Sequence, residues 1–405
     1  MKNLKGRAIF AQSGGPTAVI NASVAGGVIE ALKSEQITDV LCAENGIKGV
    51  LEENFSDMRK EDLNELQALK FTPAMAFGSV RYKMKDFAAD DTDYKRLLEI
   101  FKKYDVRYFF YNGGNDSMDT CDKIAAYMEK IGYEINVIGI PKTIDNDLAL
   151  TDHCPGYGSA AKYVATVCEE VALDAKIYGD KIVIILEIMG RNAGWLAAAA
   201  SLSEETDLVY LPEVPFSKAK FISDVKGVLS RKNHCIVAVS EGIKYDSGIL
   251  VGEDSANVDA FGHTKLGGVC AALKDEIKAR LNIKCKAIEL NILQRCAAHC
   301  ASETDVEEAF ESGRTAVKLA TSGISGKMVA IKRIGNYEVE YIPVPLSEVA
   351  NAEKAIPKEW IDFDKSNLKT EFKDYASPLI VGENKVRYEN GLPCFAKLKK
   401  IKFKL

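Results

Sequence analysis

Two carboxylates placed two residues apart could support acid–base chemistry. Asp145 and Asp147 stand in the string T-I-D-N-D, directly after an apolar run at residues 136–140. One carboxylate could take a hydroxyl proton while the other orients it or helps to place a divalent cation, as phosphoryl transfer to an alcohol requires. An Asx-rich turn or a helix cap would use the same residues. Lys142 favours the chemical interpretation, because an ammonium group beside phosphate oxygens neutralises charge in a transition state.

Two glycine pairs could bring backbone amides up to a phosphate group. Gly14-Gly15 and Gly113-Gly114 each stand between an apolar run and a stretch of helical pattern. Glycine lets the backbone approach a ligand closely, and a helix N-terminus adds a partial positive charge. A tight turn between a strand and a helix would have the same sequence, so each pair alone leaves both interpretations open.

Three arginines could bind phosphate. Arg81, Arg191 and Arg295 each carry a planar guanidinium group, which binds phosphate in a bidentate manner that lysine cannot achieve. A single arginine is more often a surface residue. Arg191 is the strongest candidate, because Met189-Gly190 places it directly after the strand pattern at residues 181–188.

Other common motifs are missing from the sequence. No G-x-x-x-x-G-K-[ST] string is present, which excludes a P-loop protein. Residues 156–161 fit a loose dinucleotide-binding pattern, but no strand precedes them. Cys296 and Cys300 lack the paired knuckles of a zinc site and are expected to pack on one helix face in a core. The four histidines show no spacing to a nucleophile, so a hydrolase is not supported.

Short apolar runs alternate with amphipathic stretches, and these elements must position the candidate residues. Strands separated by helices predict an α/β fold with doubly wound parallel sheets. The polar and glycine-rich loops follow strand ends, which is the edge where open α/β sheets bind ligands, so we expect one site. Strands are expected at residues 7–12, 40–42, 106–111, 136–140, 181–188 and 235–240, and helices at 17–34, 97–104 and 119–131.

The composition restricts the class of protein. The 405 residues carry 53 basic and 58 acidic side chains, so a basic field for nucleic acid is not expected. No apolar run reaches the ~18 residues of a transmembrane helix, and residues 1–10 lack the apolar region of a signal peptide. The ten cysteines are therefore expected to be reduced thiols in the cytoplasm. Alternating lysines at residues 397–405 predict an edge strand or a solvated end.

Taken in order, the motifs resemble those of the phosphofructokinase family. The T-I-D-N-D and M-G-R strings are the most specific parts of a match that spans roughly residues 5–330. The resemblance implies two Rossmann-like, three-layer α/β/α domains with mainly parallel sheets and an active site in the cleft between them. The domain that binds the phosphoryl donor would comprise residues 1–157 and about 295–345. The domain that binds the sugar phosphate would comprise residues 158–294 and about 346–405. The matching strings lie at residues 13–15, 78–81, 113–117, 141–147, 189–191, 212–213, 240–241 and 294–295.

Two positions distinguish the phosphoryl donor within this family. ATP-dependent members have strings similar to G-G-D-G-S in the first loop and P-G-T-I-D-N-D in the second. This chain has Asp116 in place of the last glycine of the first string and Lys142 in place of the glycine of the second. This pair, with residues 152–163, resembles the pyrophosphate-dependent members. A carboxylate at Asp116 would repel the α-phosphate of a nucleotide, and Lys142 would compensate the charge of pyrophosphate. ATP as donor, or a non-catalytic sugar-phosphate-binding paralogue, are the alternatives.

The resemblance also implies roles for individual residues in reversible phosphoryl transfer to fructose 6-phosphate, giving fructose 1,6-bisphosphate and phosphate in glycolysis and gluconeogenesis. Asp145 would deprotonate the sugar 1-hydroxyl, Asp147 would support it, and Thr143 would contact the substrate or the transferred group. The implied catalytic residues are Lys142, Thr143, Asp145, Asp147 and Arg191. Those implied to face pyrophosphate are Gly14, Gly15, Arg81, Gly114, Asp116, Ser117 and Lys142. Those implied to hold the sugar phosphate are Thr143, Asp145, Asp147, Met189, Gly190, Arg191, Glu241, Lys286 and Arg295.

The implied cofactor is Mg²⁺. Asn115 stands where many relatives have an aspartate, so the metal would rest on Asn115 and Asp116, with Asp147 or pyrophosphate contributing. Ile292 replaces the usual histidine or tyrosine, which leaves open whether a longer sugar such as sedoheptulose 7-phosphate is also accepted. The implied partners are the two small substrates and further copies of the chain, as a homodimer or homotetramer that shares sugar-phosphate ligands between subunits. Nucleic acid and membranes are not expected.

Overall fold

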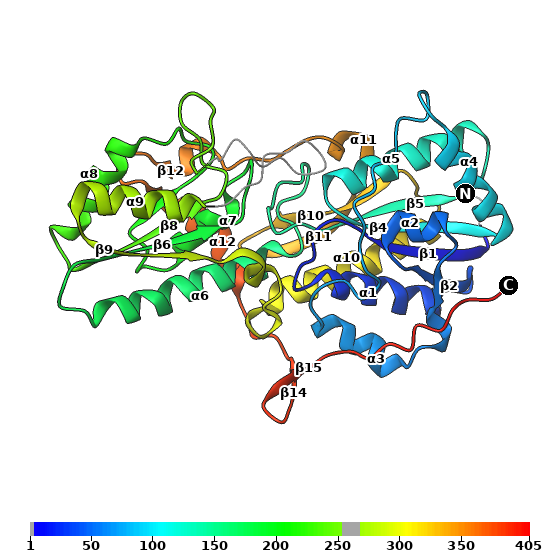
Figure 1. The fold of residues 1–405 in the computed structure, drawn as a ribbon. Helices are drawn as coiled ribbons and strands as arrows, with labels where there is room; N and C mark the ends of the chain where they lie inside the picture. The colour runs from blue at the N-terminus through cyan, green and yellow to red at the C-terminus, as the bar shows by residue number, and fades with distance from the viewer. Residues whose placement is uncertain (1–3, 253–267) are drawn as a thin grey trace.

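Two α/β lobes, each with its own sheet, lie side by side in the structure (Figure 1). The computed structural model describes residues 4–252 and 268–405. The first lobe has a seven-stranded sheet in the order β11-β10-β5-β4-β1-β2-β3, and the second a four-stranded sheet in the order β7-β8-β6-β9. Strand pairs in these two sheets are parallel except β2 with β3 and β10 with β11. The predicted α/β fold with mainly parallel sheets is confirmed.

Helices cover both faces of the first sheet. Side chains alternate along β1, so that Ala8 and Phe10 face one helical layer while Ile9 and Ala11 face the other. The first layer contains α1 (Ile20–Lys33), α3 (Leu63–Ala68) and α10 (Glu303–Thr321), and the second contains α2 (Gly46–Leu51), α4 (Thr92–Lys103), α5 (Asn115–Lys130) and α11 (Leu346–Val349). The strands are β1 (Gly6–Gln12), β2 (Ile37–Ala43), β3 (Phe55–Asp57), β4 (Val106–Gly113), β5 (Asn136–Pro141), β10 (Lys327–Ile334) and β11 (Glu338–Pro345).

The second sheet is covered in the same way. Ile184 and Leu186 face one layer and Val183 and Ile185 the other, as the alternation of side chains along a strand requires. The first layer contains α6 (Tyr157–Lys176), α7 (Trp195–Ala198) and α12 (Thr370–Ala376), and the second contains α8 (Lys218–Leu229) and α9 (Val269–Leu281). The strands are β6 (Ile182–Ile188), β7 (Leu208–Tyr210), β8 (His234–Ser240) and β9 (Lys284–Glu289).

Several element boundaries differ from the prediction. Helix α5 begins at Asn115, four residues before the expected start, because its polar first turn does not show the apolar periodicity. This places Asn115, Asp116 and Ser117 at a helix N-terminus. Helix α4 likewise begins at Thr92, and α1 begins only at Ile20. No helix covers residues 296–300. Cys296 and Ala297 lie between two short 3₁₀ turns, Asn291–Arg295 and Ala298–Cys300, and Cys296 and Cys300 are partly exposed, so the expected core packing was wrong.

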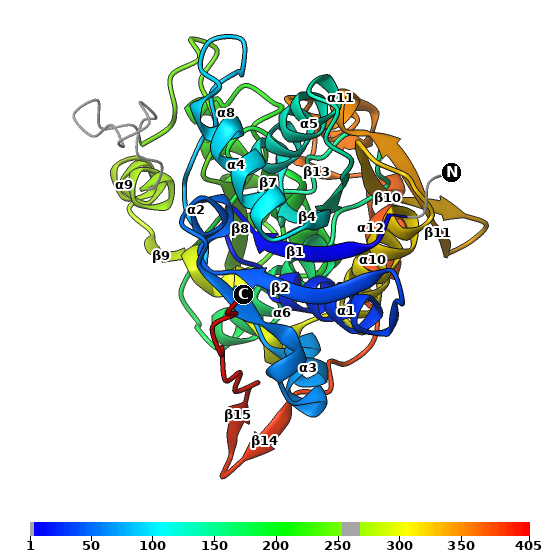
Figure 2. The same cartoon turned by 90° about the vertical axis from the view of Figure 1, so that its right-hand side faces the viewer.

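The C-terminal segment returns to the first lobe. Helix α12 packs on the second sheet, but α11 and the last residues pack on the first, which differs from the expected division at residue 346. The amide of Asp57 donates to the carbonyl of Ile401 at 2.8 Å, and that of Phe403 to Phe55 at 2.9 Å. Residues 397–405 therefore run along the sheet edge without forming a continuous strand (Figures 1 and 2). The short hairpin of β14 (Arg387–Glu389) and β15 (Leu392–Cys394) projects from the body of the protein (Figure 2).

None of the described helices combines the length and the apolar composition needed to span a lipid bilayer.

Candidate active site

Both glycine pairs lie at a point where the direction of winding in the first sheet reverses. Strands β1 and β4 are neighbours, while the chain continues from β1 to β2 on one side and from β4 to β5 on the other. Gly14-Gly15 follows β1, and Gly113-Gly114 joins β4 to the N-terminus of α5. Such a switch point at the carboxyl ends of parallel strands is where open α/β sheets bind their ligands.

Lys142 connects these loops. Its amide donates to the carbonyl of Gly113 at 3.0 Å, and its Nζ donates to the carbonyl of Gly15 at 2.8 Å. A Cβ atom on Gly14, whose φ is +80°, would lie only 3.0 Å from Lys142 Nζ. The side chain is 5% exposed, and burial lowers the pKa of Lys142 to about 8. The ammonium group therefore lies at the glycine loop in a site where its charge is poorly solvated.

The two carboxylates of the T-I-D-N-D string follow Lys142. Burial raises the pKa of Asp145, and Lys142 opposes that shift. The amide of Asp145 donates to Thr143 Oγ1 at 3.0 Å, which fixes the turn. Burial and the neighbouring Asp145 raise the pKa of Asp147 to about 6. Asn115 Nδ2 contacts Asp147 Oδ2 at 3.4 Å, so the first turn of α5 lies against the same carboxylate.

The loops of the second lobe meet this cluster through Arg295. A Cβ atom on Gly15 would lie 2.9 Å from Arg295 Nη1. Burial raises the pKa of both Asp145 and Glu241, and the guanidinium group of Arg295 opposes both shifts. Glu241 Oε1 accepts from the amide of Gly190 at 3.3 Å. Arg295, Glu241 and the M-G-R loop therefore lie together beside Asp145.

A polar pocket of about 120 Å³ opens at the carboxyl ends of β6 and β9. Glu241 and Met189 line it, and Gln294 Oε1 accepts from the amide of Met189 at 3.3 Å. Carboxylate and amide groups of this kind accept hydrogen bonds from sugar hydroxyls. The lining residues are Glu187, Ile188, Met189, Glu241, Glu289, Asn291 and Gln294.

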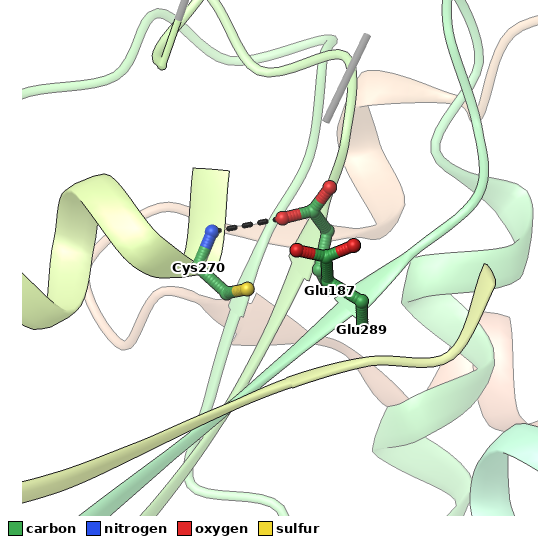
Figure 3. A group of neighbouring side chains, drawn as sticks. All are labelled: Glu187, Cys270 and Glu289. Carbon is green, nitrogen blue, oxygen red and sulfur yellow. Dashed lines mark hydrogen bonds between the residues drawn. The ribbon is translucent and has the colours of Figure 1, made fainter. Parts of the chain in front are cut away.

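One acidic cluster borders this pocket. Potential ligand atoms of Glu187, Cys270 and Glu289 lie within 4.8 Å of one another (Figure 3). Glu187 Oε2 accepts from the amide of Cys270 at 2.9 Å, at the N-terminus of α9. Burial raises the pKa of the Cys270 thiol to about 12, which keeps it protonated. The arrangement is explained by a carboxylate that satisfies a helix N-terminus, without a metal.

Three predicted residues lie apart from the buried cluster. Asp116 is exposed on the first turn of α5. Arg81 is exposed too, but its neighbour Ser79 donates to the carbonyl of Gly14 at 2.8 Å, so this segment lies beside the glycine loop. Lys286 lies on β9, pairs with Asp174 at 3.2 Å and faces away from Asp145 toward α6.

The structure adds residues that the sequence analysis missed. Asn192 follows Arg191 in the chain, and its Nδ2 donates to Glu353 Oε1 at 2.9 Å. Glu353 raises the pKa of Asp147, and the amide of Lys354 donates to the Asp147 carbonyl at 2.8 Å. Residues 353 and 354 lie some 200 positions from Asp147 in a stretch without a motif, so local sequence contained no signal for them.

Comparisons with known proteins give one family. A model described as phosphofructokinase matches residues 7–320. A pyrophosphate–fructose 6-phosphate 1-phosphotransferase of Halomonas elongata is 46% identical over 97% of this chain and 96% of its own length. One of Xanthomonas campestris is 43% identical over 98% of this chain and 97% of its own. The crystal structure of a pyrophosphate-dependent phosphofructokinase from Marinobacter aquaeolei superposes with a TM-score of 0.90 at 40% identity, covering 99% of this chain and 98% of that one.

Proposed function

The chain belongs to the phosphofructokinase family, and we propose that it transfers a phosphoryl group reversibly from pyrophosphate to the 1-hydroxyl of fructose 6-phosphate. The products are fructose 1,6-bisphosphate and phosphate. The observation that carries the proposal is the buried Lys142 at the Gly14-Gly15 loop, beside the carboxylate of Asp145. A fixed cation next to a buried base suits attack of an alcohol on a small, highly charged anhydride.

We propose that Asp145 is the general base. It accepts the proton of the 1-hydroxyl, the sugar oxygen attacks the phosphorus atom, and the bond to the leaving phosphate breaks. Burial raises the pKa of Asp145 toward that of a useful base, and Lys142 and Arg295 keep its charged form accessible. Asp147 supports the base, and Thr143 holds the turn through the amide of Asp145.

The donor is selected by charge and space. Lys142 supplies positive charge at the glycine loop. Asp116 places a negatively charged carboxylate on the first turn of α5. A nucleotide would have to place its α-phosphate against this negative charge, whereas pyrophosphate has no such group. Gly14, Gly15, Gly114, Ser117 and Arg81 complete the proposed donor site, with amides at a helix N-terminus suited to phosphate oxygens.

The sugar phosphate is proposed to lie between Arg191 and Arg295 and the pocket lined by Met189 and Glu241. Three carboxylates line that pocket, so it accepts hydroxyl groups and repels an anion. The 6-phosphate must then lie toward the arginines. Ile292 is 54% exposed at the same edge, which leaves room for a longer sugar.

We propose Mg²⁺ as the cofactor. Asn115 Oδ1 is a buried oxygen without a hydrogen-bond partner among the described residues, and its amide nitrogen contacts Asp147. Oxygen ligands of this type suit a hard divalent cation, so Asn115 and Asp147 would hold it, with Asp116 nearby. When bound, the ion neutralises charge on the pyrophosphate oxygens.

We propose that the enzyme is a homodimer or homotetramer in the cytoplasm. Leu173 on α6 and Ile177 directly after that helix are 55% and 75% exposed, and Leu293 in the turn after β9 is 54% exposed. These exposed apolar side chains lie on α6 and on the turn after β9, the edge strand of the second sheet, and a second copy of the chain would cover them. Lys286 pairs with Asp174, which follows Leu173, so it would lie at this interface. All ten cysteines are free thiols, as a reducing compartment requires.

A coupled assay of fructose 1,6-bisphosphate formation tests the function. It contains fructose 6-phosphate and Mg²⁺ with pyrophosphate or ATP as the only donor. We expect activity with pyrophosphate alone. Activity with ATP alone would overturn the donor assignment, and inactivity with both would favour a non-catalytic paralogue. Asp145→Asn should then lower kcat by about 10³-fold with little change in substrate affinity, as loss of a positioned base does, whereas exposed Asp246→Asn should not.

A further inference from the structure

A short segment after α11 crosses the active site between the two lobes. We call residues 353–356 the bridging segment. None of the family's motifs reaches these residues, and the sequence around them offers no recognisable site. Yet their backbone and side chains contact both the loop that follows Asp145 and the loop that carries Arg191.

On the side of the first lobe, Lys354 holds both ends of the loop at residues 147–152. Its amide donates to the carbonyl of Asp147 at 2.8 Å. Its Nζ donates to the carbonyls of Thr151 at 3.1 Å and Asp152 at 2.6 Å. A single lysine thus makes three hydrogen bonds to one loop, which fixes the backbone directly after the catalytic carboxylates.

On the side of the second lobe, the same segment holds the loop at residues 190–195. The indole of Trp195 donates to the carbonyl of Lys354 at 2.7 Å, and the ammonium group lies 5.1 Å from the centre of that ring. The amides of Gly194 and Ile356 both donate to Glu213 Oε1, at 2.9 and 3.3 Å.

A second link lies nearer to the substrates. Asn192 donates to both oxygens of Glu353, at 2.9 and 3.3 Å. Asn192 follows Arg191, and Glu353 pairs with Leu148, which follows Asp147. The distance between the base and the sugar-phosphate arginine is therefore set through this segment as well as through the sheets.

We propose that Lys354 is a positioning residue of the phosphoryl transfer, and that the bridging segment aligns the loop of Asp145 and Asp147 with the loop of Arg191. This inference rests on the proposed function. Each substrate is held mainly by residues of one lobe, while the chemical step needs the two lobes in register. A misplacement of about 1 Å costs on the order of 10²-fold in rate, so loss of alignment lowers kcat more than affinity.

The test compares Lys354→Met with Lys354→Arg in the full chain. The methionine retains the stem and removes the donors, while the guanidinium can still donate to carbonyl oxygens. We expect Lys354→Met to lower kcat by about ten- to a hundredfold with both KM values within about threefold, and Lys354→Arg to recover most of the rate. Lys358→Met, an exposed change four residues away, is the matched control and should behave as wild type.

The outcomes separate the two proposals. Wild-type enzyme that is inactive with pyrophosphate overturns the proposed function and this inference with it. Active wild type with an unchanged kcat in folded Lys354→Met overturns the inference alone. The inference is also overturned if both variants lose rate only in proportion to the fraction of protein that is unfolded, with stability measured by urea unfolding. If Lys354→Met does not fold, Asn192→Ala removes the second link at an exposed position, and an unchanged kcat there overturns the inference.

Discussion

Lys142 Nζ donates a hydrogen bond to the carbonyl oxygen of Gly15 at 2.8 Å, across 127 positions of sequence. The contact joins the loop after β5 to the loop after β1, and it holds a buried ammonium group where two glycines leave the backbone open. Burial lowers the pKa of Lys142 and raises that of Asp145, and each charged group opposes the shift of the other, so the proposed donor site and the proposed base are electrostatically coupled. Any substitution at Lys142 therefore changes the electrostatic environment of both the donor site and Asp145.

Removing the charge of Lys142 should therefore strongly impair the use of pyrophosphate. Lys142→Met is expected to lower kcat/KM for pyrophosphate by about 10²–10³-fold, the loss typical of one electrostatic stabiliser. Replacing both Asp116 and Lys142 by glycine removes the repulsion as well, and should produce measurable activity with ATP. The coupled assay with each donor measures both effects. Exposed Lys48→Met should leave both activities unchanged. A double variant that retains pyrophosphate as its only donor would contradict the assignment.

The buried charges also predict a bell-shaped dependence of kcat/KM on pH. An amine is charged below its pKa, which for Lys142 is lowered by burial to about 8. A carboxylate is charged above its pKa, which for Asp147 is raised by burial and by Asp145 to about 6. The rate should fall on the acid side as the Asp145–Asp147 pair gains a proton, and on the alkaline side as Lys142 loses one.

Lys142→Arg separates the two limbs of this profile. A guanidinium group stays charged throughout the accessible range, so the alkaline limb should disappear even if the maximal rate is reduced. The acid limb should remain. An alkaline limb that stays near pH 8 in this variant would show that another group causes it.

Much of this arrangement could be predicted from sequence, because it depends on local patterns. Apolar runs gave β1, β4, β5, β6 and β8 to within a few residues, and the loops that follow them do converge. The start of α5 was missed because its first turn is polar. Asp116 stabilises the helix through the helix dipole, and neither Asn115 nor Asp116 adds to the apolar periodicity. The bridging segment was beyond prediction for a different reason. Lys354 acts through backbone carbonyls, and these have no sequence signature.

The buried ion cluster behind the catalytic loop gives a prediction for stability. His153 is 1% exposed, and its ring nitrogens lie 2.8 Å from Asp152 and 2.6 Å from Glu308. Burial disfavours the charged ring, but the two carboxylates outweigh it and raise the pKa of His153. His153→Ala leaves the buried carboxylate of Glu308 without its cationic partner, while the partly exposed Asp152 keeps Arg333, and the loss costs about 3–5 kcal/mol of unfolding free energy.

The pH dependence of that loss identifies its cause. Because the folded pKa of His153 is raised, its contribution is complete below the unfolded value and is lost as pH rises through the folded value. Urea unfolding should therefore show a large difference between wild type and His153→Ala below pH 6.5, and a smaller one at alkaline pH. His299→Ala, at an exposed ring, should show no such difference. A loss that is constant with pH would indicate packing alone.

A comparison of two glycines with positive φ distinguishes the effect of backbone strain on stability from an effect on substrate binding. Gly14 has φ +80° and Gly132 has φ +71°, so alanine at either position should lower the unfolding free energy by about 1–2 kcal/mol. Their surroundings differ, because a Cβ atom on Gly14 would lie 3.0 Å from Lys142 Nζ, whereas one on Gly132 meets no atom within 4 Å. Gly14→Ala should therefore also displace the ammonium group and raise KM for pyrophosphate about tenfold, or ~1.4 kcal/mol. Gly132→Ala should leave KM unchanged. Equal kinetic effects in the two variants would mean that the loop tolerates a side chain and that Lys142 is not held by close packing.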